Sequence, residues 1–118
     1  MRLCALICAG LLATAAAAQT PTTKGTGAVL RTLDKVSGKV TDLTVPNGGA
    51  TQVGRLTVAL GECRYPPGNL QGEAYAWIDV LEPDRNRVFS GWMIASSPAL
   101  NAMDHPRYDV WVLRCSNS

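Results

Sequence analysis

The sequence lacks several patterns that would assign it to a common class of enzyme or metalloprotein. It has one histidine among 118 residues, and no C-x-x-C pair, so neither a redox motif nor a zinc finger is indicated. It has no G-x-S-x-G elbow to present a nucleophilic serine, and no carboxylate-rich calcium loop. We therefore predict no metal, no cofactor and no catalytic residue.

Charge of one sign is not concentrated anywhere along the chain. The 11 basic and 9 acidic residues are scattered and give a net charge of +2. Nucleic-acid binding requires clustered Lys and Arg that displace counterions from phosphates. Binding to a membrane surface requires a basic face beside an apolar face. The sequence predicts neither of these activities.

The chain also lacks an apolar run long enough to cross a bilayer. Its longest candidate, at the N-terminus, is shorter than the roughly 20 residues that a membrane-spanning helix needs. Arg2 precedes the apolar stretch 3–12, and small residues follow it, including Ala16 and Ala18. This order is typical of a signal peptide over residues 1–18. We predict cleavage after Ala18, export to the periplasm and no transmembrane segment.

The rest of the chain is of ordinary composition for one small domain. We predict a flexible leader over residues 19–27, which are rich in Thr, Pro and Gly, and a single β domain over residues 28–116. Cys63 and Cys115 remain after the signal is removed, and an even pair in an exported domain predicts one structural disulfide. Closing that loop contributes about 4 kcal/mol in the chain-entropy model.

The local pattern within this domain is one of strands and turns. Runs of alternating apolar and polar residues between turns rich in Gly, Pro and Asn predict six strands, at residues 28–36, 39–45, 52–63, 73–81, 87–95 and 108–115. Before the last strand, Ser97 and Pro98 predict the cap and first position of a short helix that ends before Pro106. The absence of a βαβ rhythm predicts an all-β antiparallel fold, either a small sandwich or a partly closed barrel.

The aromatic residues are concentrated in the C-terminal half, above all in FSGWMIASSPALNAMDHPRYDVW, residues 89–111. This segment, together with the upstream LDKVSGKV and the pair Cys63 and Cys115, resembles a family of uncharacterised, mostly α-proteobacterial proteins designated domain of unknown function 2155. The resemblance covers residues 28–115 and rests on the combination of the SGWM, ASSPALNA, HP and YDVW blocks. The resemblance implies a periplasmic domain, and it implies no known activity.

One interpretation of segment 89–111 is hydrolysis, or metal binding, by its polar residues. The residue types of a Ser-His-Asp triad are present: Ser96, Ser97, Asp104, His105 and Asp109. His105 and the two aspartates are also the candidate metal ligands, although one histidine is little support for a metal. The competing interpretation, which we favour, is that the serines cap a helix and that His105 is a hydrogen-bonded turn residue.

Two binding interpretations of the same segment remain. In the first, an exposed tryptophan stacks on the sugar rings of glycan or peptidoglycan. Trp92 is the candidate, since Trp77 and Trp111 lie inside strands where core packing is expected. The favoured one is a protein-interaction or structural module of the cell envelope, whose partner meets loop 96–107. The candidate binding residues are Trp92, Ser96, Ser97, Leu100, Asn101, Met103 and His105. Alternatively, Leu100 and Met103 fold back and cover the open end of the fold.

Overall fold

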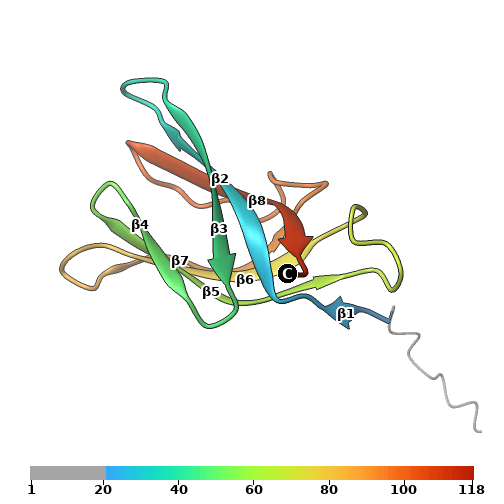
Figure 1. Cartoon of the computed structure of the whole chain (residues 1–118). Coiled ribbons are helices and arrows are strands. Elements are labelled where there is room, and N and C mark those ends of the chain that lie inside the picture. Colours follow the sequence, from blue (N-terminus) through green and yellow to red (C-terminus); the bar gives the residue numbers. More distant parts are fainter. Residues whose placement is uncertain (1–20) are drawn as a thin grey trace, which may run out of the picture.

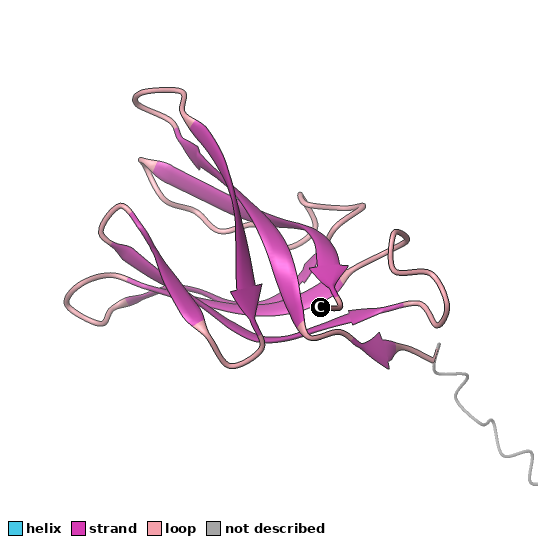
Figure 2. Ribbon diagram, viewed as in Figure 1, coloured by secondary structure: helices cyan, strands magenta, loops and turns pink. Residues whose placement is uncertain are grey.

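The computed structural model describes residues 21–118, which form two antiparallel β-sheets and no helix (Figures 1 and 2). The larger sheet contains β1 (Thr23–Lys24), β4 (Ala50–Val53), β5 (Leu56–Tyr65), β6 (Tyr75–Leu81) and β7 (Arg87–Ile94). The smaller sheet contains β2 (Gly27–Asp34), β3 (Val40–Pro46) and β8 (Tyr108–Ser116). The prediction of an all-β antiparallel fold is confirmed, and the fold is a sandwich of two sheets, not a closed barrel.

The two sheets are built around β5 and β2. β6 pairs with one edge of β5, and β4 and β1 share its other edge at opposite ends; β7 lies outside β6. β2 runs between β3 and β8. Figure 1 shows the sheets spreading apart towards the end that carries the β2–β3 and β4–β5 hairpins, and approaching each other near the C-terminus. We call the first of these the open end.

The core lies between the sheets and follows the two-residue period of the strands. In β6, Ile78 and Val80 are fully buried while the residues that alternate with them are partly exposed. Leu60 of β5 and Leu30 of β2 are likewise buried. Complete burial of one such aliphatic side chain contributes about 1.5–3 kcal/mol, so the alternation of each strand fixes which face meets the other sheet.

A disulfide joins the two sheets away from the open end. Cys63 of β5 and Cys115 of β8 are bonded, with their Cα atoms 5.6 Å apart, and both residues are buried. The predicted pairing is confirmed. Because the two residues are 52 positions apart in sequence, the bond encloses most of the domain.

The predicted short helix before the last strand is wrong. Loop 96–107 forms only isolated turns: the Ser97 N–H donates to the Ile94 carbonyl over 3.1 Å, and the Leu100 N–H donates to the Ser97 carbonyl over 3.0 Å. Extending one turn into a helix requires further hydrogen bonds to offset the cost of nucleation. Here Met103 is instead drawn into the core, with 7% of its surface exposed.

Two further differences concern the strands. The predicted strand 52–63 is interrupted at Gly54, whose φ of 61° makes a tight turn between β4 and β5. The segment 19–27, expected to be a leader, contains β1, and Gly25 is buried with its N–H donating to the Cys63 carbonyl over 2.8 Å.

The signal peptide predicted at residues 1–18 lies outside the described residues. From residue 21 onward, no helix is long and apolar enough to cross a membrane.

Candidate functional site

Loop 96–107 leaves the end of β7 and is fixed there by Glu73. The Ser96 N–H donates to Glu73 Oε1 over 2.9 Å, and the Ser96 hydroxyl donates to the other carboxylate oxygen. Burial of Glu73 acts to raise its pKa, but the hydrogen bonds from Ser96 and from the Ala74 backbone outweigh it, and the pKa lies below its usual value. Glu73 is therefore a charged anchor for the first residue of the loop.

The other end of the loop is fixed by His105. Its Nδ1 accepts the backbone N–H groups of Arg107 and Tyr108 at 3.0 and 3.1 Å. Because Nδ1 accepts two N–H groups, the hydrogen of the neutral ring is on Nε2. Nε2 lies 3.1 Å from Glu82 Oε1 and donates to it. The imidazole thus shapes the turn that enters β8.

The residues of the hypothetical triad have separate partners. The Ser96 hydroxyl contacts Glu73 and lies 3.4 Å from the Ser97 hydroxyl, whereas the His105 ring contacts Glu82. The structure therefore forms no hydrogen bond between either serine and His105. Among residues 21–118, no three His, Cys, Asp or Glu side chains gather in a way that suits a metal ion, so His105 and its neighbouring aspartates are not brought together as ligands.

The two apolar candidates in the loop have opposite environments. Met103 is buried and joins the core cluster, as the covering hypothesis predicts. Leu100 is 72% exposed, so it does not take part in covering the core. Asn101 lies between these two residues in the sequence, and its side-chain Nδ2 donates to the Trp92 carbonyl over 2.8 Å. The same side chain packs on Gly91. A Cβ at position 91 would lie only 2.8 Å from Asn101 Nδ2.

A mostly apolar pocket of about 390 Å³ lies beside this loop, between the end of β7 and the start of β8. Its walls come from all three segments: Met93, Ile94, Pro98, Ala99, Asn101, Ala102, Asp109, Val110 and Trp111. We call it the loop pocket. It lies where the SGWM, ASSPALNA and YDVW blocks of the sequence meet in space.

The tryptophans are not in the core, contrary to the expectation for Trp77 and Trp111. Trp77 alternates with buried Ala76 and Ile78, so it faces outward, and it forms an edge-to-face pair with Trp92 across β6 and β7. Their ring centroids are 5.5 Å apart, and Trp92 is 39% exposed. Trp111 is half-buried and lines the loop pocket.

A protein-family model described as "Uncharacterized protein conserved in bacteria (DUF2155)" matches residues 28–115. The chain belongs to this family. The DUF2155 match runs from β2 to β8 and includes both sheets apart from β1, as well as the disulfide and the loop pocket, so the resemblance inferred from the sequence blocks is confirmed. No curated protein and no solved structure matches the chain.

Several residues that position the loop of this DUF2155 domain were not identified from the sequence. Glu73 and Glu82 flank β6 and hold opposite ends of the loop, each across 23 positions. Lys35 donates from Nζ to the His105 carbonyl over 2.8 Å, and its N–H donates to the Arg107 carbonyl over 2.7 Å. Such long-range partners leave no periodic signal in sequence; the only hint is that both glutamates flank an apolar strand.

Proposed function

We propose that this DUF2155 protein is an exported, non-catalytic module of the cell envelope that binds a protein partner through Leu100 and the adjoining loop pocket. The observation that carries the proposal is the 72% exposure of Leu100 on a loop that is otherwise held to the fold. A large apolar side chain in water favours burial in an interface, and a position beside an apolar pocket suits the packing of a partner's side chain.

The rigidity of the loop supports a role in binding. Ser96 and His105 are each hydrogen-bonded to a glutamate, and Met103 is packed in the core between them. A loop that is already ordered loses little conformational entropy when a partner docks. The loop therefore holds Leu100 in a fixed position.

The charges at the pocket indicate the chemistry of the partner. Asp109 lines the loop pocket, and Asp104 is exposed on the loop itself. Opposite charges on the two sides of an interface steer association and set its register. We infer a partner segment with an apolar side chain that enters the pocket and a Lys or Arg beside it.

Two observations support an exported, non-catalytic role. Disulfides persist in oxidising compartments such as the periplasm, which agrees with the bond between Cys63 and Cys115 and with the signal-like N-terminus. A nucleophilic serine needs a base within hydrogen-bond reach. The His105 ring is committed to Glu82 and to two backbone donors.

The proposal is tested by crosslinking and affinity capture from the periplasm. Leu100→Asp should lose a partner that the wild type captures, and Ala102→Trp, which fills the pocket, should lose the same one. Val36→Asp is the matched control, because Val36 is 74% exposed at the tip of the β2–β3 hairpin and does not line the pocket. An identical set of captured proteins for all four forms would refute the role of the loop pocket.

A second candidate function, glycan binding, is favoured by the Trp77–Trp92 pair. The Trp77 Nε1–H donates to Asp79 Oδ2 over 3.0 Å, which fixes the ring, and Trp92 presents an exposed ring beside it. Fixed aromatic rings on a sheet face suit stacking against sugars. Cell-wall fragments should then quench tryptophan fluorescence in the wild type and in Trp111→Phe, but not in Trp92→Ala; quenching that survives in Trp92→Ala contradicts this function.

A further inference from the structure

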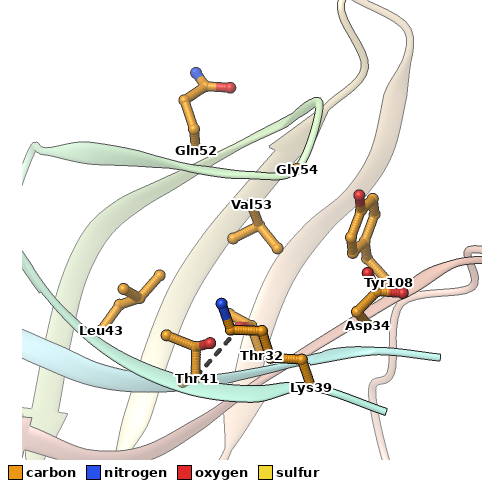
Figure 3. Close-up of a pocket in the computed structure, with 9 residues that line it drawn as sticks. All are labelled: Thr32, Asp34, Lys39, Thr41, Leu43, Gln52, Val53, Gly54 and Tyr108. Atoms are coloured by element: carbon orange, nitrogen blue, oxygen red, sulfur yellow. Dashed lines mark hydrogen bonds between the residues drawn. The ribbon is translucent and has the colours of Figure 1, made fainter. Parts of the chain in front are cut away.

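A second recess, separate from the loop pocket, lies at the open end of the sandwich. It has a volume of about 470 Å³ and is formed by the β4–β5 turn, the β6–β7 hairpin and the start of β8. We call it the end cavity. A smaller cavity of about 230 Å³ adjoins it on the other side of Tyr108, and Figure 3 shows Lys39 reaching into that smaller space. Ligand sites of small molecules usually measure about 300–1,000 Å³, so the end cavity has the size of such a site.

The wall between the two cavities is held in place. The Tyr108 ring stacks on His105, with centroids 5.7 Å apart and planes 27° apart, and the Arg107 guanidinium lies 5.3 Å from its centroid. Arg107 in turn donates to both carboxylate oxygens of Asp34, at 3.3 and 3.1 Å. Arg107 and Asp34 therefore satisfy each other, and the aromatic wall is ordered without a ligand.

The remaining charges in the end cavity are of both signs. Arg55 lines it and forms no ion pair within residues 21–118. Glu82 and Asp84 line it as well, and their hydrogen-bond partners are the His105 ring and Asn86, neither of which carries a fixed positive charge. One cation and two carboxylates thus share a recess without neutralising one another in ion pairs.

Apolar surface also lines the end cavity. Leu56 and Pro83 line the same cavity, and Tyr108 contributes its ring. A ligand complementary to this recess carries a carboxylate for Arg55, an ammonium group for the two acids and an apolar side chain for Leu56, Pro83 and Tyr108. Guanidinium groups bind carboxylates with paired hydrogen bonds, and an ammonium group has three donors to share between carboxylates.

We propose that the end cavity binds a small zwitterion, namely an apolar α-amino acid or a short peptide with both termini free. The site is distinct from the loop pocket and does not depend on the proposed protein partner.

The test is a titration of the disulfide-bonded protein with leucine, followed by the backbone ¹H–¹⁵N signals. Leucine should shift the amides of residues 54–56, 82, 84 and 108 at millimolar concentration. N-acetylleucine lacks the ammonium group and leucinamide lacks the carboxylate; each should bind at least about tenfold more weakly, because each leaves one set of charges unmatched. Leucyl-leucine distinguishes the two ligand sources, because tighter binding than leucine assigns the site to peptides and weaker binding assigns it to amino acids.

Variants separate the cavity from a general surface effect. Arg55→Gln should weaken leucine binding by about tenfold, and Asp84→Asn should also weaken it, since each removes one of the matched charges. Arg114→Gln is the control, because Arg114 is exposed on β8 outside the cavity. The proposal is overturned if leucine shifts none of these amides, if the singly charged analogues bind as well as leucine, or if Arg55→Gln binds leucine like the wild type.

Discussion

The hydroxyl of Tyr108 occupies the space that a side chain at Gly54 would need. A Cβ placed on Gly54 would lie 2.0 Å from Tyr108 Oη, far inside van der Waals contact. Tyr108 begins β8 in the smaller sheet, and Gly54 turns β4 into β5 in the larger one. The sheets are therefore in contact at the open end through this pair, whereas Cys63 and Cys115 bond them at the other end.

Replacing Gly54 with alanine should lower the free energy of unfolding by about 2–4 kcal/mol, measured by urea denaturation. A side chain at positive φ costs about 1–2 kcal/mol, and the collision with Tyr108 adds to that cost. Gly38→Ala is the matched control, since Gly38 has a φ of 79° and a Cβ at that position would meet nothing within 4 Å. It should lose only about 1–2 kcal/mol. Equal losses in the two variants would show that Tyr108 does not restrict position 54.

Removing the disulfide with Cys63→Ala and Cys115→Ala together should cost about 4 kcal/mol, because the bond closes a loop across 52 positions and restricts the unfolded chain. Urea denaturation of the oxidised wild type and the double variant measures the difference. The reduced wild type is the control and should resemble the double variant. A loss below about 1 kcal/mol would contradict a structural role for this bond.

Met103→Ala and Leu100→Ala should have different effects on stability. Met103 is buried, so its truncation leaves a cavity and should cost about 2–5 kcal/mol. Leu100 is exposed, and its truncation should change the free energy of unfolding by about 0.5 kcal/mol or less. Thermal and urea unfolding of the two variants give the comparison. Similar losses for both would mean that Leu100 is packed in solution and unavailable to a partner.

The Asp34–Arg107 pair should make stability depend on pH in the acid range. The hydrogen bond from Arg107 is the main cause that lowers the pKa of Asp34 from 3.8 to about 2. Because the folded carboxyl has the lower pKa, the pair stabilises the fold above about pH 4, and this contribution disappears as the pH falls towards 2.

The melting temperature of Asp34→Asn measures this contribution. It should lie below that of the wild type at pH 6, and the difference should shrink as the pH falls through 3 towards 2. Asp104→Asn is the control, as Asp104 is exposed and forms no ion pair within the described part of the chain. A difference that stays constant from pH 6 to pH 2 would show that the charge on Asp34 does not stabilise the fold. Added salt should also reduce the difference, because the pair is near the surface.

The strands were predictable because their signal is local. Leu56, Val58 and Leu60 alternate with polar or small residues, and that alternation alone places them on one buried face of β5. The disulfide was also predictable, since Cys63 and Cys115 were the only pair left in the predicted mature chain. These features depend on residue type and spacing, which a sequence displays directly.

The errors arose where distant residues decide the outcome. Gly54 lies within the predicted strand 52–63, and only its positive φ and the approach of Tyr108 show a turn. Ser97 and Pro98 form a good local start for a helix, but the burial of Met103 takes the chain elsewhere. Trp77 is expected in the core because it lies inside a strand, whereas β6 packs Ile78 and Val80 against the other sheet and leaves Trp77 on the opposite face.

The candidate site was predictable as a segment but not as a geometry. Leu100, Met103 and His105 lie in the predicted loop, yet their roles differ: one is exposed, one is packed in the core and one shapes the turn into β8. The roles are set by Glu73 and Glu82, whose positions beside the loop depend on how β6 pairs with its neighbours.

The hydrogen bond between Asn101 and the Trp92 carbonyl has a consequence for how copies of this protein meet one another. β7 pairs with β6 on one side only, and an unpaired strand edge is a template for intermolecular sheet growth. The Asn101 amide occupies a main-chain acceptor on that edge. A strand from another molecule would have to displace this amide before it extended the sheet at Trp92, so the loop opposes edge-to-edge pairing at that position.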